Sequence, residues 1–421
     1  MNVCRRSPLY LLCSLIVCFA SCKKGNKVTP QNPGKNLVLT SFEQQKVTAD
    51  NAFTLRLFKN LDSTNGIFTN LFASPLSVSF ALGMTSNGAA GATLTAFKKT
   101  LNFSGLSQDQ INTYYNNLIT NLPQLDPNTT LNIANSIWYR QGFSVLPAFL
   151  KTDSTNFNAQ IKALDFSNPS AVSTINNWVN NKTSGKIPAI IDKIPGNAVM
   201  YLINAMYFKS SWKEKFDPAK TKPQPFYLAD NSNVQANFMT GSIDFNYYIS
   251  DKANVYELPY SNNKYSMVII TPGLSLSGSG TTLSQLAAGL DSLQWQTWMS
   301  NLKPYKGTVT MPKFTYSYGT NLNNALGDLG LGIAFSDGAD FSLINPTAKL
   351  QISQVVHKAF VDVDESGTTA AAATSVGVIV TDASPEYNPT FNHPFIFAIR
   401  EMSSGLILFI GTMNNPLLTG N

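Results

Sequence analysis

The chain has 421 residues, of which 43% are hydrophobic and 13% charged, so it can bury a large core and is not disordered. Its formal net charge is +6, and beyond the N-terminal segment no basic run exceeds the pairs Lys23-Lys24 and Lys98-Lys99. This charge supports neither nucleic-acid binding nor strong electrostatic adhesion to membranes. Length alone favours two or three domains.

Residues 1–21 have the features of an export signal. Arg5 and Arg6 give a basic start, residues 9–20 an apolar run, and Phe19-Ala20-Ser21-Cys22 a cleavage site that ends in cysteine. The apolar run is too short to span a bilayer permanently. The pattern resembles a bacterial lipoprotein signal in which Cys22 is lipidated, although Phe19 stands where leucine is usual. A plain secretory signal is the alternative.

Cys4, Cys13 and Cys18 lie inside this signal, so the mature chain would keep only Cys22. Disulfides, thiol catalysis and thiolate metal sites are therefore excluded. Residues 22–40 are polar and contain two prolines, which predicts a flexible tether ahead of the domain.

Helical spacing begins at Ser41, where the apolar residues of one face are Val47, Phe53, Leu57, Phe58 and Leu61. Ser74-Pro75 begins a second helix, whose uncharged body predicts burial. Strand-forming residues predominate in 131–140, 199–208, 255–271 and 307–318, and helices are expected near 107–122, 171–184, 281–300 and 320–330. This mixed order favours an α+β fold over a doubly wound parallel sheet.

The segment 364–381 has the pattern of a strand without a partner. Residues 366–381 contain no charge and no proline. Alternate residues form one face that is small at first and β-branched later, namely Thr368, Ala370, Ala372, Thr374, Val376, Val378 and Val380. A polar loop with two prolines follows at 382–389. The segment could be an ordinary edge strand or a loop that can insert into a sheet later.

Catalytic chemistry has little support in this sequence. The only histidines, His357 and His393, lie in apolar segments, where a hydrogen-bonding core role is favoured over catalysis. Hydrolase, zinc-protease, phosphate-loop and dinucleotide motifs do not occur, although a generic glycosidase stays open. We therefore expect no enzyme activity, no metal site and no cofactor.

An ordered set of motifs resembles the serpin family of serine protease inhibitors from about residue 41 to Pro416. The motifs are NLFASPLS (70–77), NWV (177–179) with Thr183, Gly185, Lys186 and Ile187, LINAMYFK (202–209) leading to Trp212, VYELPY (255–260), MPKF (311–314), VVHKA (355–359), residues 365–374, NHPF (392–395) and LFIG (408–411).

The resemblance implies a single domain at 41–417, with three β-sheets, eight or nine helices and an exposed reactive loop at about 366–390. In inhibitory members a protease attacks the loop and forms an acyl-enzyme, and the cleaved loop inserts into the central sheet as a new strand. An insertion of about 15 residues spans roughly 50 Å and adds on the order of 15 hydrogen bonds at ~1 kcal/mol each. The total free energy of these new hydrogen bonds is comparable to the ~5–15 kcal/mol by which a typical protease is stable.

By the same resemblance, the hinge of the loop comprises Glu365, Gly367, Thr368, Ala370, Ala371, Ala372, Ala373 and Thr374. Ser366 and Thr369 stand where the family often has acidic residues, and both are expected to face solvent in an inserted strand. Ser74, Ser77, Asn204 and His357 would form a buried polar cluster where the sheet parts, and Trp212 would lie where the loop first enters. Plain satisfaction of buried polar groups is the alternative role for these residues.

The position of the scissile bond depends on where the count begins. Counting from Glu365 gives Thr381-Asp382, and counting back from residues 391–394 gives Ala383-Ser384, so the candidates are Val380, Thr381, Asp382 and Ala383. Cleavage after Val380 or Thr381 would favour elastase-like or subtilisin-like proteases with small apolar pockets. Cleavage after Asp382 would imply a very different target.

The sequence therefore predicts a monomeric inhibitor of serine proteases, or of cysteine proteases, that is exported and lipid-anchored to the bacterial envelope or otherwise secreted. Membrane contact would be through the lipid alone, and no nucleic acid is expected. A non-inhibitory serpin cleaved as a substrate, an envelope lipoprotein that binds a glycan or another partner, and an unrecognised hydrolase remain as alternatives.

Overall fold

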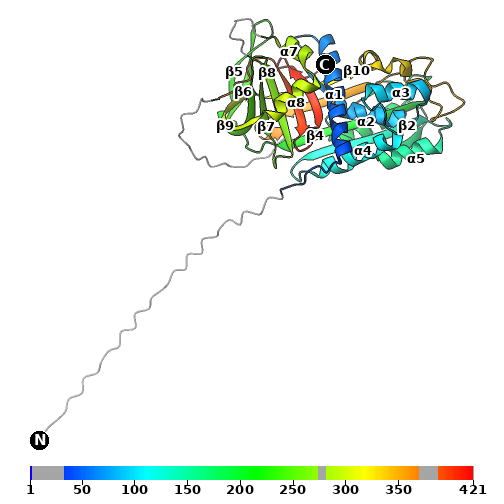
Figure 1. Ribbon diagram of the computed structural model, residues 1–421, viewed down its shortest axis with the longest axis horizontal. Helices are drawn as coiled ribbons and strands as arrows, with labels where there is room; N and C mark the ends of the chain where they lie inside the picture. Colours follow the sequence, from blue (N-terminus) through cyan, green and yellow to red (C-terminus); the bar gives the residue numbers. More distant parts are fainter. Residues whose placement is uncertain (2–32, 274–280, 369–386, 421) are drawn as a thin grey trace. The chain divides into compact units, whose positions relative to one another are not determined.

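The computed structural model describes residue 1 and residues 33–273, 281–368 and 387–420. The described residues from 33 onward belong to one compact unit. Within this unit, strands β5 to β9 gather on one side of Figure 1 and helices α2 to α5 on the other.

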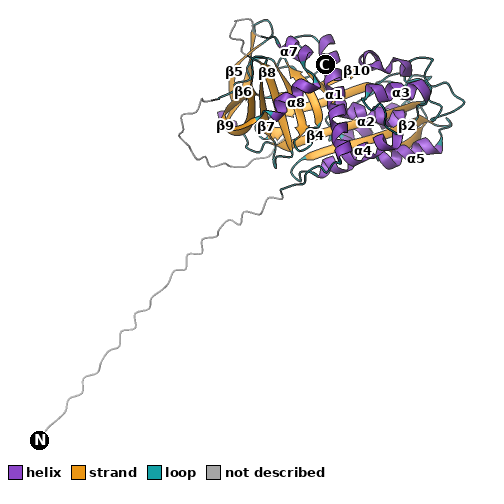
Figure 2. Ribbon diagram, in the orientation of Figure 1, coloured by secondary structure: helices purple, strands orange, loops and turns teal. Residues whose placement is uncertain are grey.

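The described residues contain nine α-helices (Figure 2), namely α1 (Ser41–Thr64), α2 (Pro75–Ser86), α3 (Gly91–Thr100), α4 (Gln108–Asn121), α5 (Pro147–Asn156), α6 (Ser170–Lys182), α7 (Leu283–Gly289), α8 (Ser292–Ser300) and α9 (Asn323–Leu326). Shorter helical turns cover Leu122–Gln124, Pro218–Lys220, Gly327–Leu331 and Gly332–Phe335. Local chemistry explains where the first two α-helices begin. Thr40 and Glu43 form a capping box at α1, and the Ser74 hydroxyl accepts a hydrogen bond from Ser77 N at the start of α2.

The described strands form three sheets. The largest has the order β1 (Leu71–Ala73), β14 (Ile407–Met413), β13 (Phe395–Glu401), β8 (Tyr265–Pro272), β7 (Ala253–Pro259), β6 (Asn233–Ile249) and β5 (Lys222–Tyr227), with β9 (Lys303–Pro312) paired to β6. The second has the order β12 (Gly367–Thr368), β4 (Met200–Ser211), β2 (Thr130–Arg140) and β3 (Gln160–Leu164). The third pairs β10 (Phe314–Asn321) with β11 (Val356–Val363).

The predicted α+β class, three sheets and eight or nine helices are confirmed, with nine α-helices among the described residues, and the helices expected at 107–122 and 171–184 are α4 and α6. Three predicted segments are each divided in two. Residues 255–271 become β7 and β8, because a turn with positive φ at Ser261 and Asn263 reverses the chain. Residues 281–300 become α7 and α8, because the Asp291 side chain accepts from Gln294 N and caps a new helix. Residues 307–318 are shared between β9 and β10.

The boundary between β4 and β11, which we call the seam, is the feature that positions the candidate site. These strands belong to different sheets and lie close together without forming a shared backbone ladder. The short strand β12 contacts both of them at one end of the seam. A sheet edge on either side of the seam therefore presents backbone groups that a further strand could pair with.

Candidate functional site

The predicted hinge begins at one end of the seam. After β11 the chain reverses through a turn in which Asp364 N donates to Gly367 O at 2.9 Å and Gly367 N donates to Asp364 O at 3.2 Å. Gly367 and Thr368 then pair with Ser211 and Ser210 of β4. Two hinge residues thus already occupy the position of a strand beside β4.

Gly367 is the residue that allows this close approach. Its φ of +139° lies in a region that residues with side chains rarely adopt. A Cβ atom at this position would lie 2.2 Å from the carbonyl oxygen of Ser210 and 2.6 Å from the backbone nitrogen of Trp212. Glycine is therefore required for β12 to lie against β4.

Trp212 holds the turn that precedes β12. Its backbone N–H donates to Ser366 O and its indole N–H donates to Asp364 O, each at 2.9 Å. The indole ring is buried and stacks on Tyr260, with centroids 4.6 Å apart and planes 8° apart. The Tyr260 hydroxyl in turn lies 3.0 Å from the hydroxyl of Thr368. The structure therefore places Trp212 beside the first residues of the predicted hinge.

Glu365 is fixed on the other side of the turn. Its carboxylate accepts from Lys313 Nζ at 2.7 Å and from the Thr221 hydroxyl at 2.6 Å. Burial alone would raise the pKa of Glu365, but these hydrogen bonds hold that pKa below its ordinary value. The carboxylate is therefore a charged anchor for the hinge.

The polar residues predicted at the middle of the seam meet at the start of α2. The backbone N–H of Ser74 donates to His357 Nε2 at 3.1 Å, and the Ser74 hydroxyl donates to Leu408 O at 2.8 Å. The Ser77 hydroxyl donates to Asn204 Oδ1. The helix thus bonds to β4 through Asn204 and to β11 through His357, one residue on each side of the seam.

His357 is buried, and burial lowers its pKa to about 4. Because Nε2 accepts a hydrogen bond, the ring is neutral in the folded protein. The predicted core hydrogen-bonding role agrees with this position. For His393 that prediction is wrong, because its ring is exposed and stacks on Tyr227 with centroids 5.0 Å apart.

The buried neutral ring predicts a dependence of stability on pH. An unfolded histidine takes up a proton as the pH falls below about 6.5, whereas folded His357 does so only near pH 4. The unfolded state therefore binds more protons in this interval, and the free energy of unfolding falls by up to about 3 kcal/mol between pH 6.5 and 4.

Replacing His357 by glutamine removes this contribution. Melting temperatures measured from pH 4 to 8 should show that wild type is more stable than His357→Gln at pH 7 and that its advantage shrinks toward pH 4. Burial raises the pKa of Asp50 to about 7, which gives a pH dependence of stability of the opposite sign. This contribution is the same in wild type and variant, so it cancels when the two are compared. Two parallel pH curves would contradict the assignment of a buried neutral histidine.

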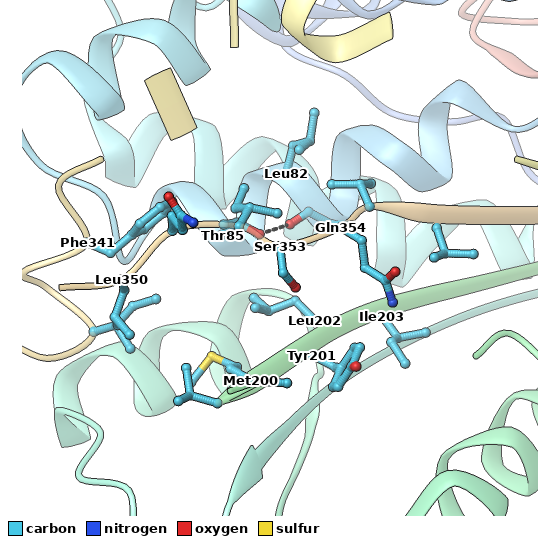
Figure 3. A pocket seen from close by; sticks show the side chains of 18 of the residues that line it. Leu82, Thr85, Met200, Tyr201, Leu202, Ile203, Phe341, Leu350, Ser353 and Gln354 are labelled. Atoms are coloured by element: carbon cyan, nitrogen blue, oxygen red, sulfur yellow. Dashed lines mark hydrogen bonds between the residues drawn. The ribbon is translucent and has the colours of Figure 1, made fainter. Parts of the chain in front are cut away.

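A cavity of about 400 Å³ lies along the seam beyond this polar cluster (Figure 3). β4 contributes Met200, Tyr201, Leu202 and Ile203 to its lining, the segment 349–357 faces them, and α2 contributes Leu82 and Thr85. The side chains that meet here are mainly apolar. The seam is therefore open between β4 and the chain that leads into β11, with no strand between them in the described residues.

The far end of the predicted reactive loop is attached to β9. Thr308 N donates to Asn388 Oδ1 at 2.9 Å, and Thr310 N donates to Pro389 O at 2.9 Å. The ring of Tyr387 lies 4.6 Å from that of Tyr247. The predicted loop positions between β12 and Tyr387 lie outside the described residues, namely Ala370, Ala371, Ala372, Ala373, Thr374, Val380, Thr381, Asp382 and Ala383. The predicted lipidation site Cys22 also lies outside them.

Sequence reasoning missed several residues that complete the site. Asn135 of β2 accepts a hydrogen bond from Asn204 Nδ2 at 2.7 Å and extends the polar cluster across the second sheet. A buried asparagine inside a strand-forming segment is the signal that could have identified it. Tyr260 and Lys313 lie in motifs that were recognised, but their contacts to Thr368 and Glu365 depend on long-range folding.

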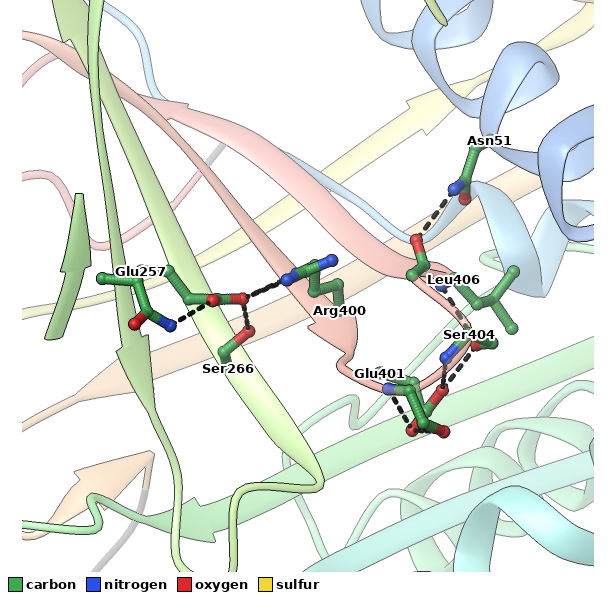
Figure 4. A network of polar contacts seen from close by, with 10 residues as sticks. Asn51, Glu257, Ser266, Arg400, Glu401, Ser404 and Leu406 are labelled. Atoms are coloured by element: carbon green, nitrogen blue, oxygen red, sulfur yellow. Dashed lines mark hydrogen bonds and ion pairs between the residues drawn. The ribbon is translucent and has the colours of Figure 1, made fainter. Parts of the chain in front are cut away.

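A second polar network belongs to the large sheet (Figure 4). The Glu257 carboxylate accepts from Arg400 Nε at 2.7 Å and from the Ser266 hydroxyl at 2.7 Å. The Glu401 carboxylate accepts from the backbone and hydroxyl groups of Ser403 and Ser404. Both carboxylates are buried and hydrogen-bonded, so these contacts stabilise the sheet.

Two properties of the described part of the chain concern membranes and metals. None of its helices combines the length and apolar character needed to cross a bilayer. None of its His, Cys, Asp and Glu side chains gather in groups of three or more that could hold a metal ion.

Known proteins share this architecture. The family model described as Serpin (serine protease inhibitor) matches residues 48–416. The leukocyte elastase inhibitor of Sus scrofa is 34% identical over 381 residues, which cover 89% of this chain and 100% of the relative. The solved structure of a thermophilic serpin, tengpin, in the native state matches with a TM-score of 0.80 and 33% identity, over 91% of this chain and 97% of that chain. Human thyroxine-binding globulin complexed with thyroxine matches with a TM-score of 0.79 and 27% identity, over 89% and 99%.

Proposed function

The chain belongs to the serpin family, whose members are in general protease inhibitors and not enzymes, and we propose that it traps serine proteases by inserting its cleaved loop into the seam. Its three sheets and the nine α-helices of its described residues have the serpin fold. Two observations carry the proposal: β12 pairs with β4 at one end of the seam, and beyond the polar cluster a cavity separates β4 from the chain that leads into β11.

The seam supports insertion on three physical grounds. The edges of β4 and β11 offer backbone donors and acceptors to a new strand. The hinge residues Gly367 and Thr368 are already in register with Ser211 and Ser210, so the loop does not have to find its place. The hinge sequence from Thr368 to Thr374 has only small side chains and no charge or proline, which would otherwise obstruct pairing.

The chemical sequence of trapping follows from the proposal. The protease serine attacks a carbonyl carbon within 380–384, the peptide bond breaks, and the new amino terminus leaves while an acyl-enzyme ester remains. The loop then inserts from Thr368 onward and carries the attached protease away from the cleavage point. Trapping succeeds when insertion is faster than hydrolysis of the ester.

The target class follows from the residues before the proposed cut. Val380 or Thr381 would fit proteases with small apolar pockets, elastase-like or subtilisin-like. The similarity to a leukocyte elastase inhibitor supports the same class. The protein would act as a monomer, once per molecule, with a cysteine protease as the alternative target.

Incubation with pancreatic elastase or subtilisin, followed by denaturing electrophoresis, tests the proposal. An inhibitor gives a protein–protease band that survives boiling. About one molecule of this protein should be enough to inactivate one molecule of protease. A clipped band alone would identify a non-inhibitory member cleaved as a substrate. Peptide mapping of the cleaved loop would then assign the scissile bond.

The proposal also includes export and lipid attachment at Cys22. Arg5, Arg6, the apolar run and the small residues before Cys22 support it. Mass spectrometry of the mature N-terminal peptide from a bacterial membrane fraction should show acyl chains on Cys22, and Cys22→Ser should release the protein. An unmodified Cys22 would overturn lipid attachment and leave simple secretion.

A further inference from the structure

Helix α6 and the segment that follows it pack mainly on the β4 side of the seam, and Val356 and Phe360 of β11 lie at the edge of the same apolar cluster. Trp178, Ile175 and Val179 of α6 are buried in a core cluster with side chains of β2 and β4. The rings of Trp178 and Trp138 of β2 lie 6.0 Å apart, edge to face. This apolar contact fixes α6 to the sheet that contains β4.

Lys186 extends its side chain away from that cluster and across the seam to β11. Its backbone N–H donates to Thr183 O at 3.1 Å, and the next residue, Ile187, is buried in the cluster. Its ammonium group, however, lies 3.7 Å from Asp362 Oδ2 and 4.7 Å from the centre of the Phe360 ring. Both of these residues belong to β11, so the lysine spans the seam.

The acceptor is itself fixed in the second sheet. The other oxygen of Asp362 accepts from the Thr315 hydroxyl at 2.6 Å, and Thr315 is the cross-strand partner of Asp362 on β10. A side chain rooted on the β4 side thus makes an ion pair and a cation–π contact with a rigid group on the β11 side.

We propose that Lys186 is a positioning residue that latches the seam and must release before a strand can insert fully. The inference rests on the proposed function, because it concerns the rate of insertion. A new strand between β4 and β11 increases their separation by about 4.8 Å. Since α6 stays with β2 and β4 through its larger apolar contact, the lysine loses Asp362 and Phe360 as the seam opens.

The latch therefore stabilises the intact form and not the inserted form. Ion pairs that are only partly buried contribute modestly, so its release is expected to change the insertion rate by about two- to five-fold. An ordinary surface contact would instead stabilise both forms equally. The difference between the two forms is the property that distinguishes a latch from a structural contact.

Lys186→Met keeps the apolar stem over Phe360 and removes the charge. We expect the variant to form the protease complex about two- to five-fold faster than wild type, and its intact form to melt roughly 1–2 °C lower. The loop-cleaved forms of variant and wild type should melt together. Asp362→Asn, which keeps an acceptor for Thr315, should reproduce both effects. Lys306→Met is the matched control, because Lys306 pairs with Asp244 at 3.3 Å between the neighbouring strands β9 and β6.

The outcomes separate the latch from the proposed function. If wild type forms the complex and Lys186→Met reacts no faster, the latch is wrong and inhibition stands. If wild type forms no complex, the proposed inhibition is wrong, but the melting temperatures still test the latch. A lower melting temperature of Lys186→Met in the intact form alone supports the latch. An equal decrease in the melting temperatures of the intact and cleaved forms, or no decrease in either, overturns the latch.

Discussion

Replacing Thr368 by arginine is expected to turn the protein from an inhibitor into a substrate. Thr368 is only 4% exposed, pairs with Ser210 of β4, and has its hydroxyl 3.0 Å from that of Tyr260. A guanidinium in this place would be buried without a partner, at a cost of about 3–5 kcal/mol, so the intact variant is expected to release this residue to solvent and to incur the cost only when the loop inserts. A barrier higher by ~3 kcal/mol slows insertion about 100-fold, while hydrolysis of the acyl ester continues unchanged.

Elastase or subtilisin should therefore cleave all of the Thr368→Arg variant, and the protease should be released in an active form. Denaturing gels should show a clipped band without a stable complex, and titration should need at least about ten molecules of variant per protease, against about one for wild type. The matched control is Thr369→Arg, which strand alternation would direct to the opposite face. Stoichiometric inhibition retained by Thr368→Arg would show that the hinge does not insert at this position.

Replacing Gly367 by alanine is expected to expel β12 from its place beside β4. The added Cβ would lie 2.2 Å from Ser210 O, and that oxygen belongs to a paired strand that cannot move aside. The positive φ adds a further cost of about 1–3 kcal/mol. Without the first two pairs, the loop must start its insertion from outside the sheet.

Stopped-flow or discontinuous assays should show that Gly367→Ala forms the protease complex at least about tenfold more slowly than wild type. More of the variant should appear as clipped product. Gly142→Ala is the control, since Gly142 also has a positive φ, of +83°, but no atom within 4 Å of the added Cβ. If both variants inhibit at the wild-type rate, the close approach of Gly367 to β4 has no role in insertion.

The sequence predicted the parts of the fold that depend on local patterns. Helix α2 was predicted because Ser74-Pro75 is a strong start signal and the body carries no charge. The division of 255–271 and 281–300 was missed because each break depends on a single turn or cap within a continuous apolar pattern. Periodicity averages over such short interruptions.

The candidate site was predicted only in part, and for a related reason. Ser74, Ser77, Asn204 and His357 were grouped by resemblance, and the structure brings them together at the start of α2. The contacts of Lys186 with Asp362 and of Tyr260 with Thr368 join residues more than 100 positions apart. No local pattern predicts such pairs, because they arise from the way the sheets pack on one another.

The most direct test of loop insertion is the melting temperature of the protein before and after a single cut in residues 380–384. Insertion of the cut loop would add on the order of 15 hydrogen bonds at ~1 kcal/mol each and raise the melting temperature by roughly 15–20 °C. Loop insertion predicts that the cut protein, freed of protease, unfolds at a much higher temperature than the intact protein. A cut protein that unfolds at the same temperature as the intact one, or lower, would contradict it.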